Sequence, residues 1–371
     1  MKLSRWIRIY IIPAAVCQSV IVGGGYGTGR EVVEFISQNG PVGGMAGLLV
    51  YAAVASIVLA LSFEFARSFR VYDYQHFFRS LIGRGWMLYE LFVIAGLLLI
   101  LAVTGSAAAS ILNDGFGIPR LYGVGLVLLA VTALNYYGRQ VVESSLTLWA
   151  VFLNAVFIFY AVFVLSHQYE PIISSFTHSE LQPGWFSGGL RYSLNNTALI
   201  PLLLYATHAI ETRRQAIISS LIASLTITVP GLLFHLSFMA DYPRVLDQEL
   251  PTYWMIQNLA LPGFTGIYVV VLFGTIAQTG VGILQGLNER LDAWALEARG
   301  RILTRPLHAT IAGAALLISL LLANLGITTL VAQGYGNAAW ISLLIFQLPL
   351  CSIGLYKIID YWRHTGERSN T

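Results

Sequence analysis

The hydrophobic pattern divides the chain into long apolar stretches separated by short polar connections. Each apolar stretch has roughly 20 residues or more, which is enough for an α-helix to cross a bilayer core about 30 Å thick. No connection has room for a soluble domain, so residues 1–371 are expected to form a single transmembrane domain. The ten predicted spans are 6–38, 41–66, 86–112, 119–137, 144–166, 184–209, 215–239, 263–288, 306–323 and 335–360.

Composition supports an all-α integral membrane protein. Hydrophobic residues make up 56% of the chain and charged residues only 11%, against about 25% charged in ordinary soluble domains. The net charge of +3 is small and scattered, which excludes a nucleic-acid partner. Cys17 and Cys351 lie in apolar stretches without a CxxC pattern or a histidine cluster, so neither a disulfide framework nor a metal site is predicted.

The positive residues predict the orientation of the spans. With a cytoplasmic N-terminus, alternation across ten spans places all but four of the 21 Lys and Arg residues in the cytoplasm, as the positive-inside rule requires. Both termini are therefore expected to be cytoplasmic. On the outer side, the connection 240–262 mixes apolar residues with carboxylates at irregular helical spacing. A short surface helix or lid and an ordinary solvated loop both fit this pattern.

The first span contains the least helix-like stretch of the chain, which reads I-V-G-G-G-Y-G-T-G-R-E-V-V-E from Ile21 to Glu34. An interior glycine costs a helix about 0.8–1 kcal/mol relative to alanine, so the five glycines predict a helix break near the middle of the bilayer. Such a break must face protein or water, where its free peptide groups can bind a solute. The alternative is that the glycines only allow close helix packing. The predicted substrate-binding residues here are Gly23, Gly24, Gly25, Tyr26, Gly27, Thr28 and Gly29.

A second interruption is predicted in the sixth span, between Tyr192 and Pro201. Paired asparagines, Ser, Thr and a proline all weaken a helix there. Ten spans divide into halves of about 6–167 and 184–362, and five spans per half permit an inverted repeat. Matching breaks in the two halves point to a transport site, although a polar patch that joins helices is the alternative. The predicted substrate-binding residues are Leu194, Asn195, Asn196 and Thr197.

Three charges follow the glycine run inside the first span. A charge at the centre of a span costs at least about 2.5–3.5 kcal/mol, so Arg30, Glu31 and Glu34 are expected to have a compensating role. Arg30 and Glu34 are four residues apart and can pair on one helix face, while Glu31 points elsewhere. One interpretation is a self-neutralising ion pair. The other is that Glu31 or Glu34 exchanges a coupling proton, because desolvation favours the protonated carboxyl group, and that Arg30 belongs to an outer gate.

The run G-G-G-Y-G-T-G-R-E, the Q-N-G-P that follows it, the ten spans and the length of about 370 residues resemble the YkvI-like family of bacterial membrane proteins across essentially the whole chain. That family is similar to the amino acid–polyamine–organocation transporters. The resemblance implies a bacterial cytoplasmic membrane protein with the LeuT-type fold, in which spans one to five and six to ten are inverted repeats and spans one and six are discontinuous around the substrate.

The same resemblance implies further site residues. Span three lines the substrate site in similar transporters, so Thr104 is a candidate, although a packing seam of small residues explains it as well. Thr279 and Gln278 in span eight fall where two hydroxyl residues commonly help hold a sodium ion against span one at Gly23. Thr279 keeps the hydroxyl and is the candidate Na⁺ ligand, whereas Gln278 departs from the pattern and leaves both residues open to a packing role.

The expected function is secondary active transport of a small polar or zwitterionic organic solute, with an amino acid or a related compound favoured, by alternating access coupled to Na⁺ or H⁺. Amides near Gly24 to Thr28 are expected to hold the solute carboxylate. A receptor or sensor on a transporter scaffold is the alternative. The glycine run fits neither GxGxxG nor a phosphate loop, and HExxH and GxSxG are missing from the sequence, so no enzyme and no cofactor beyond the coupling ion are predicted. The expected partners are the solute and the lipid bilayer, and the sequence does not indicate an oligomeric state.

Overall fold

The computed structural model describes residues 4–120, 122–123, 125, 152, 155–177, 179–259, 263–300 and 303–365. Every regular element within these residues is helical. Four helical stretches are long and apolar enough to cross a membrane, namely Arg30–Phe69, Tyr74–Gly115, Arg213–Asp241 and Ile327–His364. A fifth candidate combines Ala155–His167 with Tyr169–Thr177, which meet at a bend of 73°. The chain is thus a multi-pass membrane protein. Most of the predicted fourth span lies outside the described residues, and the count of ten spans stays a prediction.

The N-terminal part contains several short elements followed by two long helices. Pro13 near the start of α1 and Pro41 near the start of α4 have the fixed φ that suits the first helical turn. Asp73 caps α5 by accepting a hydrogen bond from the His76 amide at 2.9 Å. The elements are η1 Ile7–Ile11, α1 Ile12–Ile21, α2 Gly24–Gly27, α3 Arg30–Phe35, η2 Ser37–Asn39, α4 Gly40–Phe69, α5 Tyr74–Ile82, η3 Gly83–Gly85 and α6 Trp86–Phe116.

The C-terminal part repeats this mixture of long and short helices. Thr212 and Gln215 form a capping box that sets the start of α11. The elements are α9 Tyr169–Thr177, α10 Trp185–Thr197, η4 Ile200–Thr207, α11 Arg213–Phe238, η5 Met239–Asp241, η6 Arg244–Asp247, α12 Pro251–Asn258, α13 Phe264–Arg299, α14 Arg305–Ala323, α15 Ile327–Thr329, η7 Leu330–Tyr335, α16 Gly336–Ser342, η8 Leu343–Gln347, η9 Leu350–Gly354 and α17 Leu355–Thr365.

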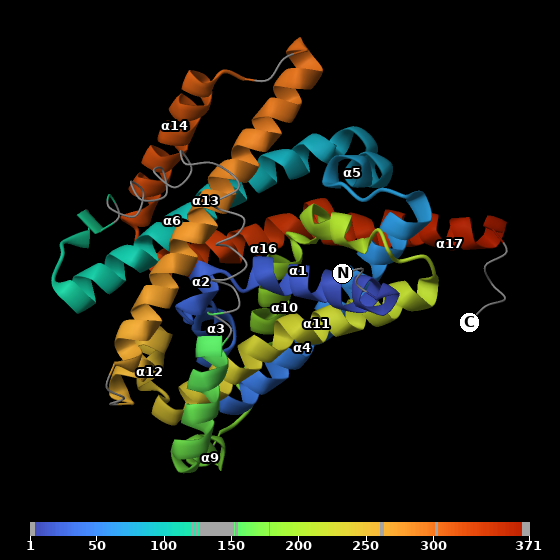
Figure 1. Ribbon diagram of the computed structural model, residues 1–371. Coiled ribbons are helices and arrows are strands. Elements are labelled where there is room, and N and C mark those ends of the chain that lie inside the picture. Colours follow the sequence, from blue (N-terminus) through green and yellow to red (C-terminus); the bar gives the residue numbers. More distant parts are fainter. Residues whose placement is uncertain are drawn as a thin grey trace.

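The short helices α2 and α3 lie among longer helices near the middle of the molecule, and α1 connects them to the N-terminal end (Figure 1). On one side, α4 packs against α10 and α11, and α11 also packs against α1. On the other side, α6 packs against α13 and α14, while α13 contacts α2. The interrupted first segment is therefore enclosed by protein, as irregular backbone within a membrane requires.

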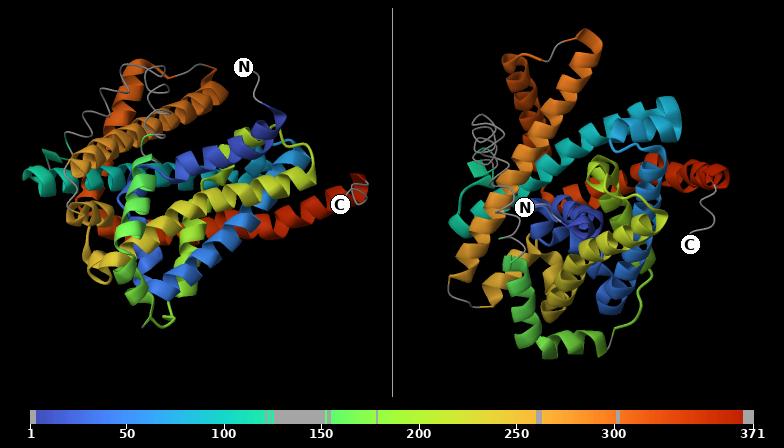
Figure 2. Two further views of the ribbon diagram at one scale, coloured as in Figure 1. Left: turned by 60° about the horizontal axis from the view of Figure 1, so that its bottom comes forward. Right: turned by 45° about the vertical axis from the view of Figure 1, so that its right-hand side comes forward.

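Both ends of the chain contact the region around the start of α11, at one end of the molecule. Arg5 pairs with Glu211 just before α11, and the Arg213 guanidinium lies 3.7 Å from the ring centre of Trp362 in α17. Figure 2 shows α9 and α12 at the end opposite the C-terminus. The arginines in these contacts belong to the set that the sequence assigns to the cytoplasm.

Candidate functional site

The glycine run from Gly23 to Gly29 interrupts the helix twice. The helix α1 ends at Ile21, where Val22 has φ −88° and ψ +68°, and α2 then lasts a single turn. Gly29 has φ +79°, and a Cβ atom there would lie 2.5 Å from side-chain atoms of both Phe238 and Thr252. Conformation and space therefore both require glycine at position 29.

Side chains and backbone from the second half of the chain bind the carbonyl groups of this segment. The Tyr268 hydroxyl of α13 donates to the Gly27 carbonyl at 3.0 Å. The Thr252 amide of α12 donates to the Thr28 carbonyl at 3.1 Å. Within this connection, α12 (Pro251–Asn258) is a short helix packed onto the break, which agrees with the predicted helix and not with a solvated loop. Residues 240–259 are called the lid region below, and the role of a lid stays a prediction.

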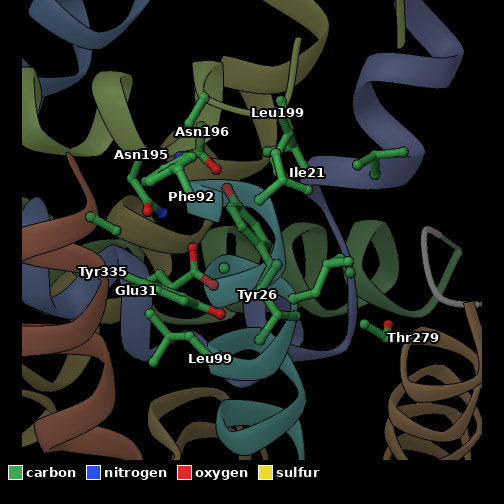
Figure 3. Close-up of a pocket in the computed structure, with 18 residues that line it drawn as sticks. Ile21, Tyr26, Glu31, Phe92, Leu99, Asn195, Asn196, Leu199, Thr279 and Tyr335 are labelled. Carbon is green, nitrogen blue, oxygen red and sulfur yellow. The ribbon is translucent and has the colours of Figure 1, made fainter. Parts of the chain in front are cut away.

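A cavity of about 90 Å³ lies beside the break (Figure 3). A cavity needs about 10–15 Å³ to hold one water molecule. This cavity therefore has room for a solute with on the order of six to nine heavy atoms. Its walls come from the end of α1, the region from Gly23 to Glu31, α6, the end of α10 and the residues after it, α13, η7 and α16. The lining residues are Val20, Ile21, Gly23, Tyr26, Glu31, Phe92, Val93, Gly96, Leu97, Leu99, Ile100, Asn195, Asn196, Ala198, Leu199, Thr279, Tyr335 and Ala338.

The cavity brings together five residues that the sequence predicted as substrate- or ion-binding, from three separate parts of the chain. Gly23 and Tyr26 come from the predicted first span, Asn195 and Asn196 from the predicted sixth, and Thr279 from the predicted eighth. The Asn196 side chain donates to the Tyr192 carbonyl at 3.0 Å, so its orientation is fixed by its own helix.

Other predicted residues lie behind the cavity wall. The Leu194 carbonyl accepts hydrogen bonds from Ser342 and Gln347, both at 3.1 Å. Gln347 also donates to the Thr197 hydroxyl at 3.1 Å. Thr104 is buried in α6 and donates to the Leu101 carbonyl at 3.0 Å. In this conformation the structure places Leu194, Thr197 and Thr104 in helix contacts.

In the glycine run, too, some residues line the cavity and others make contacts within the helix. Gly23 lines the cavity, whereas Gly27, Thr28 and Gly29 are not among its described lining residues. Whether Gly24 and Gly25 line it lies outside the described part of the structure. The amides of Gly27 and Gly29 donate to the carbonyls of Gly23 and Tyr26 at 3.1 and 2.9 Å.

The predicted ion ligands of the first and eighth spans lie next to each other. A Cβ atom on Gly23 would be 3.5 Å from the Thr279 hydroxyl oxygen and 3.8 Å from the Val20 carbonyl oxygen. Two oxygens from different spans thus flank one point, and oxygen ligands are what a hard cation needs. Gln278 belongs to α13, but its side chain lies outside the described part of the structure. Among the described residues, no group of three or more His, Cys, Asp or Glu side chains is arranged to hold a metal ion.

The three charges of α3 have different environments. Arg30 pairs with Glu34 at 2.8 Å, as their spacing predicts, and both side chains are largely buried. Arg30 also donates to the carbonyls of Leu246 and Gln248 in the lid region at 2.9 and 3.0 Å. Glu31 instead lines the cavity and is 6% exposed.

Sequence reasoning missed several residues that shape this region. Phe92 and Tyr335 line the cavity, and Gln347 holds the sixth span from behind. The sequence contained two features that could have identified them. Tyr335 stands between two glycines, and Gln347 is an isolated polar residue in a long apolar stretch.

Comparisons with known proteins agree with the resemblance seen in the sequence. No protein-family model matches the chain. The uncharacterized membrane protein YkvI of Bacillus subtilis (strain 168) is 25% identical over 298 residues, which cover 76% of this chain and 80% of that protein. The chain is thus a homologue of YkvI, and the predicted resemblance is confirmed.

Two solved structures share the fold. One is a Na⁺-coupled sialic acid symporter in a substrate-bound outward-open state, with a TM-score of 0.54, 12% identity, and coverage of 95% of this chain and 86% of that chain. The other is MhsT in complex with L-phenylalanine, with a TM-score of 0.56, 16% identity, and coverage of 96% and 89%. These similarities show an all-helical fold of the LeuT type.

Proposed function

We propose that this chain is a secondary active transporter of a small polar or zwitterionic organic solute, with an amino acid or a related compound as the favoured class. It works by alternating access through ten transmembrane spans, arranged as a 5+5 inverted repeat in which spans one and six are discontinuous. The observation that supports this best is the cavity between the two interrupted segments, lined by Gly23 and Tyr26 on one side and by Asn195 and Asn196 on the other.

The shared fold supports the proposal. One protein with this fold is a Na⁺-coupled symporter, and the other was crystallised with an amino acid. The cavity lies where the resemblance places the substrate, and its size suits a small organic molecule better than a metal ion or a large metabolite.

Coupling by Na⁺ would use the point between Thr279 and Gly23, with Gln278 as a further candidate. Coupling by H⁺ would use Glu31, the carboxyl group that lines the cavity. Arg30 and Glu34 suit the role of an outer gate, because Arg30 connects α3 to carbonyls of the lid region. When the gate opens, these contacts must break.

Accumulation in proteoliposomes tests the proposal. An inward Na⁺ or H⁺ gradient should drive uptake of at least one labelled amino acid or amine above its equilibrium level, and collapse of the gradient should release it. If Na⁺ is the coupling ion, Thr279→Val should reduce Na⁺-dependent uptake at least tenfold, because valine keeps the shape of threonine and removes the oxygen ligand. Binding of a solute without any flux in either gradient would favour the receptor or sensor alternative.

A further inference from the structure

One acidic side chain lines the cavity. Of the 18 lining residues, all in the described part of the chain, Glu31 is the only one with a carboxyl group, and none is Lys, Arg or His. Within the described part of the chain, the Glu31 side chain makes no hydrogen bond or ion pair, and it is 6% exposed. Its neighbour Arg30 is committed to Glu34 and to two carbonyls of the lid region. A buried carboxylate without a partner is costly, so this position is prepared for a positive group.

The polar groups around Glu31 favour a hydrogen-bond donor. A carboxylate offers two acceptor oxygens and no donor, whereas an ammonium group offers three donors and no acceptor. One N–H of the Asn196 amide is used on the Tyr192 carbonyl, which leaves the amide oxygen of Asn196 as an acceptor. The side chains of Glu31 and Asn195 point into the same part of the cavity (Figure 3).

Three backbone amides of the broken segment are not available to a solute carboxylate. The amides of Gly27, Gly29 and Arg30 already donate to groups within the same segment, at 3.1, 2.9 and 3.2 Å. These are three of the amides that a broken helix would otherwise present to an anion. With no cationic side chain on the wall, an anionic group would lie in the same cavity as the Glu31 carboxylate.

The rest of the wall suits a hydrocarbon body with a cationic head. Val93, Leu97 and Leu99 provide apolar surface, and Phe92 and Tyr335 provide aromatic rings that attract a cation placed near their faces. The volume of about 90 Å³ restricts this body to a few carbon atoms.

Taking the cavity as the solute site of the proposed transporter, we propose that its solute is a small primary amine in the protonated form and that Glu31 is the counter-ion of the ammonium group. A carboxylate on the solute is not required. An amino acid binds through its amino group, and the corresponding amine without the carboxylate binds as well or better.

Four probes of similar shape test this on the full chain in lipid nanodiscs, by thermal unfolding and isothermal titration. They are isobutylamine, L-valine, 3-methylbutanoate and 2-methylpropan-1-ol, which carry respectively the amino group alone, both groups, the carboxylate alone and no charge. Isobutylamine and L-valine should raise the unfolding temperature. Isobutylamine should bind at least tenfold more tightly than the alcohol, which isolates the contribution of the charge without any mutation.

Variants then assign the charge to one residue. Glu31→Gln should weaken isobutylamine binding at least tenfold, and Glu31→Asp, which keeps the carboxylate, should retain part of the affinity. Glu180→Gln is the matched control, because Glu180 is exposed and lies outside the cavity wall. If Glu31→Gln does not fold, the comparison of amine with alcohol in the unaltered protein decides.

The proposal is overturned if 3-methylbutanoate or the alcohol binds as tightly as isobutylamine, or if no amine stabilises the protein. It is also overturned if folded Glu31→Gln keeps its amine affinity within twofold, which would fit a residue that only exchanges protons. Binding and flux are separate readouts. Amine binding without accumulation contradicts the transport function alone, and accumulation of a solute that has no amino group contradicts the role of Glu31 alone.

Discussion

At the scale of single residues, Arg30 and Glu31 are adjacent in the sequence but have different surroundings. Arg30 is surrounded by acceptors, since the Glu34 carboxylate and the carbonyls of Leu246 and Gln248 all lie within 3.0 Å of its guanidinium nitrogens. Glu31 is left facing the cavity. The short helix α3 therefore carries two neighbouring ionisable residues with different roles. Arg30 is bound to other parts of the protein, and Glu31 faces the cavity, where a ligand can reach it.

Replacing Arg30 tests the connection to the lid. Arg30→Gln leaves Glu34 buried without its partner and leaves two lid carbonyls without a donor, and loss of one partner from a buried pair costs about 3–5 kcal/mol. Arg30→Lys should recover only part of this loss, because an ammonium group lacks the planar fork that reaches several acceptors at once. Thermal or denaturant unfolding in nanodiscs measures both variants.

The control for this experiment is the ion pair of Arg120 with Glu249, whose side chains are 50% and 36% exposed. An exposed pair contributes about 0–1 kcal/mol, so Arg120→Gln should change stability by less than 1 kcal/mol. Equal losses for Arg30→Gln and Arg120→Gln would contradict the assignment of Arg30 to a buried network.

The sequence predicted the break in the first span and the pairing within it, but not the distant residues that bind its free carbonyl groups. Glycine clustering gives the break, and the spacing of Arg30 and Glu34 gives their pair. Tyr268 and Thr252 bind the freed carbonyls of Gly27 and Thr28 across more than 200 residues of sequence. Such contacts depend on how helices rotate against each other, and hydropathy alone does not encode that rotation.

At the scale of helices, α4 and α10 approach each other through glycines. A Cβ atom on Gly189 would lie 2.2 Å from the Gly47 carbonyl oxygen of α4, and one on the neighbouring Gly188 would lie 2.2 Å from the Phe35 carbonyl oxygen of α3. Both obstacles are backbone atoms, which cannot move aside as a flexible side chain can. Close packing through small residues, the alternative considered for the run from Gly23 to Gly29, is thus clearly present at this helix pair.

Gly189→Ala should therefore separate α4 from α10 and reduce the amount of folded protein severely. Gly266→Ala in α13 is the matched control, because nothing lies within 4 Å of its added Cβ. Alanine stabilises a helix by up to about 1 kcal/mol relative to glycine. Gly266→Ala should therefore leave the stability of the protein unchanged or raise it slightly. Size-exclusion chromatography and unfolding temperatures after extraction compare the two. Equal unfolding temperatures would show that the two helices can move apart without cost.

At the scale of the whole molecule, hydropathy was sufficient to predict helices and membrane insertion, since both follow from summed properties of long segments. The sequence left a short helix and a solvated loop open for the connection 240–262. Periodicity could not decide between them, because Thr252, Met255 and Ile256 are buried only by the packing of α12 onto the broken span. The inverted repeat and the span count depend on residues 126–151, which lie outside the described part of the structure.

The orientation in the membrane is the prediction that joins sequence and structure at this scale. Contacts of Arg5 with Glu211 and of Arg213 with Trp362 lie at one end of the molecule, and α12 lies at the other. Because arginines are retained on the cytoplasmic side during insertion, the first end is expected to be cytoplasmic and the lid extracellular.

Cysteine labelling in intact cells decides the orientation. The exposed Cys351 is first replaced by serine, while the buried Cys17 is kept. A membrane-impermeant maleimide should then label Glu180→Cys and Asp247→Cys from outside, and should reach Ser4→Cys and Arg84→Cys only after permeabilisation. All four native side chains are exposed, so a difference in labelling reports the side of the membrane and not burial within the protein. Labelling at residue 4 and residue 247 from the same side of the membrane would place the N-terminus and the lid together, and the proposed alternating access through this cavity would then lose its outer gate.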